Sequence, residues 1–561
     1  MNAGHRRSFT TPGVGVESRG NDDNDDNGDD DDYDDNDDNG DDYHDTGSAA
    51  MSEQGGGYVR EVDYTFGYYQ YLSPARLRQL FLHLGWAAPE VKTACELGFG
   101  QGVSVNMHAA ASGIQWFGTD FNASQAAFAR ELAAASGSGA QLFDQDFHQF
   151  CQRSDLPDFD FIGIHGIWSW VSNETRAILT DFLKRKLRNG GVLYISYNTQ
   201  PGWASMGPMR ELMAEYRHVM CAPGQGMLAG VEASLAFAEK VVGASTLHGA
   251  ANPHMVARMR QLKTQNRNYL AHEFFNQDWV PMSFSRISAA LTSANLTFAG
   301  SADFLDQLDD VNLTAEHQAL LAEIPDATFR QTVRDWCINQ QFRRDYWIKG
   351  PRQLESATLA EEQRALRFIL AQPRADVSLK VAGSLGEGAM RDEVYGPVLD
   401  ALADHTPKSV RELEALLVPA TISYRQLCEV LLVLSGSGTL AVAQDDANAA
   451  KAREPAARLN EYLCKMARSG DRIAYLVSPV AGAGVSVSRF AKLFMLARAE
   501  GKTEPAEWAA YAWDVIAAQG EQLVNDGVAV EGAAANLEEL TRRAEGFAKD
   551  HLPVFRALGI A

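Results

Sequence analysis

The stretch Cys95-Glu96-Leu97-Gly98-Phe99-Gly100-Gln101-Gly102 decides the fold. It follows a short run of β-type residues and leads into a helical pattern. Glycines are needed where a chain turns this sharply and a ligand touches its backbone. A dinucleotide-binding loop of the form G-x-G-x-x-G would need its third glycine at position 103, where this chain has Val103. The loop is therefore predicted to bind a ligand other than a pyrophosphate.

Acidic residues stand at the ends of the next two predicted strands. Asp120 follows Gly98 by 22 residues, where a carboxylate can accept both hydroxyls of a ribose. Asp146 and Phe147 follow the third strand, where an acid can accept from an adenine amino group and a ring can stack on the base. Taken singly, Asp146 could be a helix cap and Phe147 a core residue. Together with Glu96 before Gly-x-Gly-x-Gly, the methyltransferase form of this loop, the spacing predicts S-adenosylmethionine as the cofactor.

Strand-like runs alternate with amphipathic helical runs over the first half of the chain. The predicted strands are residues 92–97, 115–119, 140–143, 159–164 and 191–197, and the predicted helices between them include residues 124–135 and 174–187. Strands separated by single helices imply right-handed crossovers, a parallel sheet and helices on both of its faces. The predicted fold class is therefore α/β, with a Rossmann-like class I methyltransferase sheet.

The domain organisation follows from where this alternation starts and stops. Residues 1–50 are rich in Asp, Asn and Gly and are predicted to form a disordered acidic tail, with Met51 as an alternative start of translation. Residues 51–303 form the predicted methyltransferase domain. Within it, the stretch between the fifth strand and the next β-type run is longer than one helix and a short loop require, so residues 201–285 are predicted to be a helical insert. Beyond it we expect few strands: a helical regulatory or linker segment (304–350), a winged-helix-like helical domain (351–450) and a helical C-terminal domain (451–561).

Charge and composition exclude several classes of partner. Residues 1–50 hold fifteen Asp and one Glu against three Arg, so that −10 of the net charge of −23 remains for the rest of the chain. A mildly acidic body predicts no nucleic-acid partner, since nucleic-acid affinity comes largely from Lys and Arg on phosphates. The chain has no apolar run of bilayer length and no secretory signal, and its six cysteines form no CxxC pair. We therefore expect a cytoplasmic protein without membrane insertion.

Two longer motifs resemble a known family. Residues 159–171 read Phe-Asp-Phe-Ile-Gly-Ile-His-Gly-Ile-Trp-Ser-Trp-Val, and residues 196–203 read Ser-Tyr-Asn-Thr-Gln-Pro-Gly-Trp. Both closely resemble a bacterial group of class I methyltransferases that carry a methyltransferase regulatory domain. The resemblance covers about residues 58–349 and includes Tyr269-Leu270-Ala271-His272-Glu273 and Phe342-Arg343-Arg344. The best-known members are protein-lysine methyltransferases that modify a bacterial outer-membrane protein.

The chain departs from this family at two places. The family has Gly-Gly-Asn after the loop, where this chain has Gly102-Val103-Ser104. The family's N-terminal Pro-Tyr-x-Ser-x-x-Phe is replaced by Asp63-Tyr64-Thr65-Phe66-Gly67-Tyr68-Tyr69, which keeps aromatic residues and loses the proline and the serine. That segment is expected to close over the cofactor, so the departure predicts a different substrate preference.

The resemblance and the spacing together imply a set of site residues. The expected cofactor-binding residues are Glu96, Gly98, Gly100, Gly102, Asp120, Phe121, Asp146, Phe147 and His165. A lysine amine must be neutral to accept a methyl group, and an aromatic pocket of low dielectric lowers its pKa. The expected catalytic residues are Tyr197, Asn198, Trp168 and Tyr64, and the expected substrate-binding residues are Trp170, Trp203, His272 and Glu273.

Several alternatives stay open from the sequence. Trp168 and Trp170 could be core residues, and His272-Glu273 could lie at the surface. His272-Glu273 resembles half of a zinc motif, but Asn276 stands where the next ligand would fall, so no metal is expected. The acceptor is a protein lysine on resemblance alone, with a small molecule or a glycan precursor as the alternative. A cofactor-binding scaffold without turnover is a third hypothesis, and a homodimer is a further expectation.

Overall fold

The computed structural model describes residues 14–15, 58–59, 61–62, 64–222, 224–244, 246–418, 422–525 and 528–561. Of residues 1–50, for which we expected disorder, the structure describes Val14 and Gly15, and the others lie outside these ranges, as does Asp63. Val14–Gly15 form strand β1, which pairs antiparallel with β11 (Gly386–Met390) and corrects that expectation at these two residues. Every helix of the described part is too short or too polar to cross a membrane.

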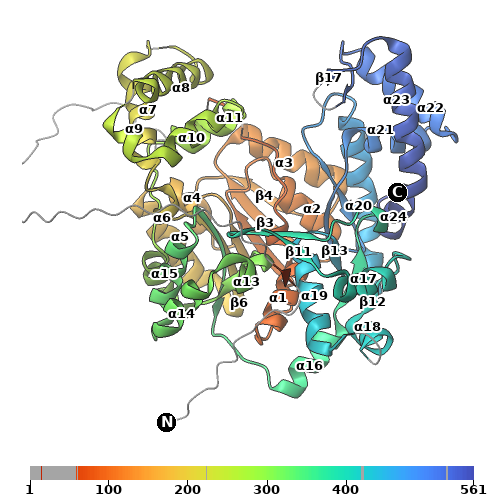
Figure 1. Cartoon of the computed structure of the whole chain (residues 1–561), viewed down its shortest axis with the longest axis horizontal. Helices are drawn as coiled ribbons and strands as arrows, with labels where there is room; N and C mark the ends of the chain where they lie inside the picture. Colours follow the sequence, from red (N-terminus) through yellow and green to blue (C-terminus); the bar gives the residue numbers. More distant parts are fainter. Residues whose placement is uncertain are drawn as a thin grey trace, which may run out of the picture.

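A seven-stranded sheet forms the centre of the molecule, in the order β4-β3-β2-β5-β6-β8-β7 (Figure 1). Neighbours among its first five strands are parallel, and β8 is antiparallel to both β6 and β7. The strands are β2 (Thr93–Leu97), β3 (Gln115–Asp120), β4 (Gln141–Asp144), β5 (Phe159–Ile164), β6 (Leu187–Asn198), β7 (Leu296–Ser301) and β8 (Phe342–Lys349). The five predicted parallel strands and the α/β fold class are confirmed.

Helices cover both faces of this sheet, as predicted. One buried cluster joins the sheet to α1 (Pro74–His83), α2 (Val103–Ala111) and α3 (Ala123–Ser136). A second cluster, on the other face, joins it to α4 (Phe147–Cys151), α5 (Asn173–Lys186) and α12 (Phe284–Thr292). The side chain of Ser172 accepts from the backbone of Thr175 and caps α5, which ends at Lys186, before the glycines at 190 and 191. Those glycines lie inside the long strand β6.

The insert between β6 and β7 is helical, as the sequence predicted. It comprises α6 (Gln200–Trp203), α7 (Gly207–Met220), α8 (Met227–Gly243), α9 (Leu247–Ala251), α10 (Pro253–Leu262) and α11 (Arg267–Phe274). Its core is rich in methionine, and Trp203 is buried there beside Met206 and Phe274. Figure 1 shows α7 to α11 on one side of the molecule and the C-terminal helices α20 to α24 on the other, with the sheet between them.

The segment of residues 304–350 corrects the sequence analysis, because it ends in strand β8 rather than in helix alone. Helices α13 (Asp309–Asn312), α14 (Ala315–Glu323) and α15 (Ala327–Cys337) precede it. Strand β8 fills the place between β6 and β7, so a domain boundary at residue 303 would cut through the sheet. The sequence of β8 is Phe-Arg-Arg-Asp-Tyr-Trp-Ile-Lys. Its charged residues do not suggest a buried strand, because Arg343 and Asp345 are buried as an ion pair.

The C-terminal region is mainly helical but holds more strands than expected. Its helices are α16 (Ser356–Ala365), α17 (Asp392–Ala401), α18 (Val410–Leu417), α19 (Tyr424–Gly436), α20 (Asp446–Met466), α21 (Arg489–Ala499), α22 (Pro505–Ala517), α23 (Ala533–Gly546) and α24 (Leu552–Ala557). Its strands are β9 (Arg367–Leu370), β10 (Lys380–Gly383), β11, β12 (Lys408–Ser409), β13 (Leu440–Ala443), β14 (Tyr475–Ser478), β15 (Ala483–Ser486), β16 (Val524–Asn525) and β17 (Val528–Ala529). Helices α17 to α19 share a core with the sheet β12-β9-β13, in the part of the chain for which the sequence predicts a winged-helix-like unit.

Arg343 is the centre of a buried network that holds β8 in the sheet. Its guanidinium donates to Asp335 on α15 at 2.6 Å and to Asp345 on its own strand at 3.0 Å, and all three side chains are almost fully buried. The Tyr197 hydroxyl of β6 donates to the same Asp345 carboxylate at 2.7 Å. The network therefore joins β6, β8 and α15 through charge-assisted hydrogen bonds.

We predict that Asp345→Asn destabilises the fold by about 3–5 kcal/mol, because it leaves part of a buried guanidinium charge without a partner. Chemical denaturation of the purified protein measures this. The matched control is Arg411→Gln, which removes the exposed pair with Glu361 and should cost under about 1 kcal/mol. Equal midpoints for both variants would contradict the role given to the Arg343 network.

Candidate cofactor and acceptor site

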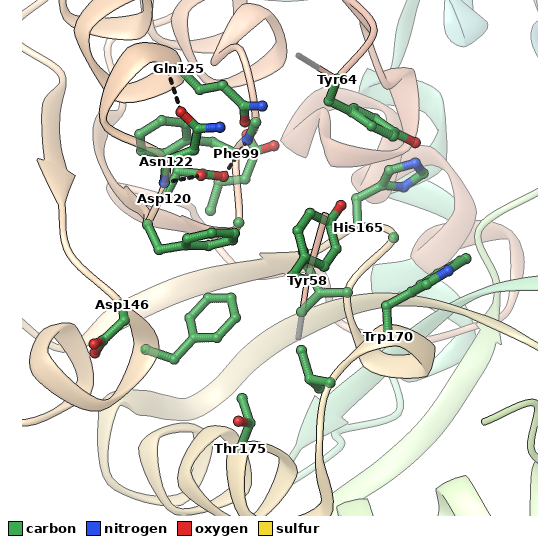
Figure 2. Close-up of a pocket in the computed structure, with 18 of the residues that line it drawn as sticks. Tyr58, Tyr64, Phe99, Asp120, Asn122, Gln125, Asp146, His165, Trp170 and Thr175 are labelled. Atoms are coloured by element: carbon green, nitrogen blue, oxygen red, sulfur yellow. Dashed lines mark hydrogen bonds between the residues drawn. The ribbon is translucent and has the colours of Figure 1, made fainter. Parts of the chain in front are cut away.

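A cavity of about 440 Å³ opens at the carboxyl ends of β2, β3, β4 and β5. This is the edge where ligands bind in open α/β sheets. In Figure 2, Asp120 and Asn122 lie on one side of the cavity and Tyr64, His165 and Trp170 on the other, with Tyr58 between them. The residues lining it include the expected Glu96, Gly98, Gly100, Asp120, Phe121, Asp146, Phe147, His165, Tyr64 and Trp170.

The glycine loop shapes the floor of this cavity. Gly98, Gly100 and Gly102 all have positive φ, between 56° and 74°, which favours glycine. A Cβ atom at Gly98 would overlap the side chain of Ile167, and one at Gly102 would overlap Ala129 of α3. Gly98 and Gly100 line the cavity, whereas Gly102 packs below it at the start of α2. The loop therefore exposes backbone to the cavity at two of its three glycines.

Asp120 is held in the cavity wall by two backbone amides. Its carboxylate accepts from Gly100 N at 2.8 Å and from Asn122 N at 2.9 Å, so it ties the loop after β2 to the loop after β3. Burial raises its pKa to about 6, and the two amide hydrogen bonds oppose that rise. A carboxylate has about four acceptor positions, so the two amides leave capacity for ligand hydroxyls.

Glu96 lies at the buried base of the cavity, at the end of β2. Its side chain is 1% exposed, and its Oε2 atom has no hydrogen-bond partner among the described residues. Burial, followed by the nearby Asp120 charge, raises its pKa to about 8. An unpartnered buried carboxyl oxygen is costly unless a ligand satisfies it, and a cationic group would do so most strongly.

Asp146 and Phe147 stand at the end of β4, where Asp146 caps a helix and both residues line the cavity. The Asp146 side chain accepts from Gln149 N at 2.8 Å and caps α4. Both residues also line the cavity, as does Phe121 after β3. The ring of Phe121 meets the ring of Tyr58 edge-on at 5.5 Å. Capping fixes the direction of Asp146, and the two phenylalanine rings give this end of the cavity apolar walls.

His165 follows β5 and is neutral. Its ring stacks on Tyr69 at 3.6 Å, and its Nδ1 lies 2.8 Å from the Tyr194 hydroxyl. Burial, with a smaller effect from Arg344, lowers the pKa of His165 to about 3. His165 therefore cannot act as a cation near neutral pH, and it serves as a flat polar surface beside the cavity.

Residues 64–71, here called the aromatic strap, form the upper wall. Tyr64, Thr65, Gly67 and Tyr69 of the strap line the cavity. Ser104 on α2 accepts from Tyr69 N at 2.7 Å, and Gln101 donates to Tyr64 O at 3.4 Å. Ser104 is one of the residues by which the chain departs from the related family, and here it fixes the strap. The strap covers the glycine loop from the side opposite Asp120.

The insert also holds the segment before the strap. The His272 ring nitrogen Nε2 lies 2.8 Å from Val62 O, and the Asn276 side chain accepts from Val59 N at 2.8 Å. The His272 ring meets the Tyr64 ring edge-on at 5.1 Å. Neither His272 nor Glu273 lines the cavity. Glu273 is buried, and the side-chain amide of Asn198 lies 3.4 Å from the Glu273 carboxylate. Burial raises the pKa of Glu273 to about 7. The polar pair therefore supports the segment around the cavity rather than facing it.

Four other expected site residues lie away from the cavity, which corrects the sequence analysis. Tyr197 points to the opposite side of β6, where its hydroxyl binds Asp345. Trp168 is buried in the same core, and Trp203 is buried in the core of the insert. Asn198 is buried, and its backbone N donates to Ser169 Oγ. Both faces of β6 are buried, so side-chain alternation could not tell which face met the cavity.

Two carboxylates of the cavity lining, Glu174 and Asp278, were not predicted from the sequence. The described residues around the cavity include five carboxylates, those of Glu96, Asp120, Asp146, Glu174 and Asp278, and neither Lys nor Arg. Glu174 and Asp278 join the site from the start of α5 and from the end of the insert. Residues so far apart in sequence give no local signal. The cavity therefore favours cationic ligands.

Comparison with known proteins gives a family and a fold. Residues 266–349 match a family model described as a predicted methyltransferase regulatory domain, and they span α11, α12, β7 and β8. The chain is 35% identical over 510 residues to the uncharacterized protein sll1526 of Synechocystis, which covers 90% of this chain and 99% of that protein. It is 29% identical over 235 residues to the uncharacterized protein RP789 of Rickettsia prowazekii, across 39% of this chain and 41% of the relative.

Among solved structures, the chain is similar to PKMT2 from Rickettsia typhi in complex with AdoHcy. The two superpose with a TM-score of 0.62 at 15% sequence identity, covering 88% of this chain and 99% of PKMT2. At 15% identity the similarity shows a shared fold. It includes the C-terminal region, because the coverage leaves little of either chain outside the superposition.

Asp120→Ala should weaken binding of S-adenosylhomocysteine by roughly 2–4 kcal/mol, because two partly charge-assisted hydrogen bonds to ribose hydroxyls are lost. Isothermal titration calorimetry measures this. The matched control is Asp144→Ala, an exposed carboxylate at the end of β4, which should leave the affinity unchanged. Melting temperatures of both variants show that the fold persists. Unchanged affinity in Asp120→Ala would overturn the ribose assignment.

Binding of S-adenosylhomocysteine should strengthen as pH rises from 6 to 7.5. The Glu96 pKa of about 8 means that this carboxyl is neutral below pH 8 without ligand, and it must lose its proton to pair with a cationic amino group. Affinity is therefore lost as pH falls, by up to about tenfold per pH unit. Titrations of the parent and of Glu96→Gln test this, and a parallel pH dependence in both would remove Glu96 from the account.

Proposed function

Because the chain belongs to a bacterial family of class I methyltransferases that carry a methyltransferase regulatory domain, we propose that it transfers the methyl group of S-adenosylmethionine to lysine side chains of an acceptor protein. The observation that carries this proposal is the charge of the cavity. Five carboxylates and no Lys or Arg among its described lining residues suit a cationic cofactor and a cationic acceptor. An acceptor that carries phosphate, such as a nucleotide-linked glycan precursor, would be repelled by the same lining.

The lining residues fit the proposed cofactor group by group. The unpartnered Glu96 oxygen suits the ammonium of the methionine part, and the free acceptor positions of Asp120 suit the ribose hydroxyls. Phe121 and Phe147 supply apolar surface for the adenine, beside the carboxylate of Asp146. Gly98 and Gly100 let the backbone approach the ligand without a Cβ in between. This assignment places the adenosine part of the ligand on the β3 and β4 side.

The acceptor is proposed to enter between the aromatic strap and the turn after β5. Trp170, Tyr64 and Tyr69 face this part of the cavity, and Glu174 and Asp278 add negative charge near it. A lysine ammonium is attracted by both the ring faces and the carboxylates. Desolvation among the aromatic rings lowers the lysine pKa, whereas the nearby carboxylates raise it, and the amine must lose its proton before it can accept a methyl group.

In the proposed reaction these residues contribute mainly by positioning the acceptor and less by reacting themselves. When bound, the cofactor supplies a methyl group on a positively charged sulfur, which is already a strong electrophile. The acceptor nitrogen would have to lose its proton first and then point its lone pair at this methyl group, in line with the bond to sulfur. The strap and the turn after β5 would hold the amine in line and exclude water, which is worth up to roughly 7–11 kcal/mol in favourable cases.

Transfer should appear on protein when the enzyme is incubated with methyl-labelled S-adenosylmethionine and a bacterial lysate. Mass spectrometry should find the label on lysine. Label confined to small molecules would favour a small-molecule acceptor, and no transfer at all despite tight cofactor binding would favour a binding scaffold. These two outcomes would each replace the lysine proposal while leaving the cofactor site intact.

Trp170→Ala should lower the turnover rate much more than it lowers the affinity for S-adenosylhomocysteine, because the ring acts on alignment of the acceptor. Trp336→Ala is the matched control, since Trp336 is 69% exposed on α15 and outside this cavity. Equal loss of turnover and of cofactor affinity in Trp170→Ala would place that ring on the cofactor instead of the acceptor.

A further inference from the structure

A second cavity of about 500 Å³ lies on the other side of the aromatic strap. One wall is made by Tyr68, Tyr69, Gln70 and Tyr71 of the strap and by the first turns of α1. The opposite wall comes from the C-terminal region, through β13, the hairpin of β14 and β15, and the chain around α24. Its volume lies within the range of pockets for small organic molecules, and no part of the proposed methyl transfer uses it.

Arg76 is the distinctive residue of this cavity. It lines the cavity from α1, yet its side chain is only 9% exposed. Nη1 donates to Ser435 O at 2.9 Å, while Nε and Nη2 have no hydrogen-bond partner among the described residues. The guanidinium lies 3.8 Å from the centre of the Phe304 ring. Arg76 is therefore a buried cation that the described protein satisfies only in part.

No carboxylate of the described chain forms an ion pair with Arg76. Asp303 is near enough to act on its charge, but it accepts from the Tyr71 hydroxyl at 3.3 Å and pairs with Arg344 at 3.8 Å. Burial lowers the Arg76 pKa, although a guanidinium stays protonated in proteins. A buried, partly unpaired cation is costly to the fold, and an anionic ligand would offset that cost.

Aromatic rings lie in several parts of the remaining lining. Tyr68, Tyr69, Tyr71, Tyr475 and Phe555 bring five rings to the cavity. The side chains of His551 and Asp376, 3.7 Å apart, lie on the C-terminal side. This lining contrasts with the cofactor cavity, where all the charged side chains other than histidine are carboxylates. The two cavities therefore select ligands of different charge.

We propose that this second cavity is a binding site for a small organic anion with a flat apolar body, whose acidic group pairs with the Arg76 guanidinium and whose body packs on the tyrosine rings. The acidic group is a carboxylate, sulfonate or phosphate, since each can accept from a guanidinium fork. The proposal goes beyond methyl transfer and does not depend on the identity of the methyl acceptor.

The second site is linked to the first through the strap. Tyr69 lines both cavities, and it stacks on His165 in the cofactor cavity. Its neighbour Tyr68 accepts from Gly484 N at 2.8 Å and meets the Tyr475 ring at 4.9 Å, so the C-terminal hairpin holds the strap from the second cavity. An anion that packs on Tyr68 and Tyr69 would order the strap over the cofactor. Binding at the two sites is therefore coupled and mutually strengthening.

The probe for this site is 8-anilinonaphthalene-1-sulfonate, a flat aromatic sulfonate whose fluorescence rises in apolar surroundings. The full-length protein is first saturated with S-adenosylhomocysteine, so that the cofactor cavity is filled. We expect saturable binding of one probe molecule and, reciprocally, tighter binding of S-adenosylhomocysteine when the probe is present. Absence of saturable binding would overturn the site, and an unchanged S-adenosylhomocysteine affinity at saturating probe would overturn the coupling.

Two variants separate the site from a general apolar surface. Arg76→Met should weaken the probe by roughly tenfold or more, because it keeps an unbranched apolar chain and removes the charge. Arg78→Met, on the same helix but 47% exposed, should bind the probe as the parent does. Ala75→Phe fills the cavity without changing charge and should also block the probe. Melting temperatures and S-adenosylhomocysteine binding confirm that each variant is folded, and probe binding that survives both Arg76→Met and Ala75→Phe would place the dye elsewhere.

Discussion

The aromatic strap is the constraint on which the rest of the site depends, because it is held by three parts of the chain at once. Ser104 and Gln101 fix it to α2 and the glycine loop. His272 holds the segment just before it from the insert, and Gly484 holds Tyr68 from the C-terminal hairpin. Residues 64–71 pair with no strand among the described residues, so these contacts are what holds the strap in place. The insert and the C-terminal region therefore both help to hold the strap that forms one wall of the cavity.

Charge separates the tasks of the two cavities. Around the cofactor cavity, burial raises the pKa of Glu96 and Asp120, so part of its negative charge develops only when a cationic ligand arrives. In the second cavity the buried charge is the guanidinium of Arg76, whereas the Asp376 carboxylate beside His551 is about half exposed. Each site thus carries a group that its own protein surroundings satisfy poorly. Such groups are costly to the fold and are retained where a ligand completes them.

The sequence predicted the parts of the fold that local pattern controls. Buried parallel strands read as short apolar runs, and the glycine loop and the acids after β2, β3 and β4 mark where those strands end. Strand β8 was not predicted, because a run that contains Arg343 and Asp345 looks polar in sequence, although the two side chains are buried as an ion pair. Trp168 and Trp170 lie two residues apart in one turn, yet only Trp170 lines the cavity. The second cavity joins Arg76 to Ser435, which no local pattern could indicate.

Hydrogen–deuterium exchange of the full chain, with and without S-adenosylhomocysteine, tests the central claim most directly. The claim is that the glycine loop and the aromatic strap close around the cofactor as one unit. Exchange should slow at residues 98–102, at residues 120–122 and at residues 64–69, while the exposed helices α9 and α14 should not change. Slowing confined to the loop, with an unaffected strap, or slowing in another part of the chain would contradict it.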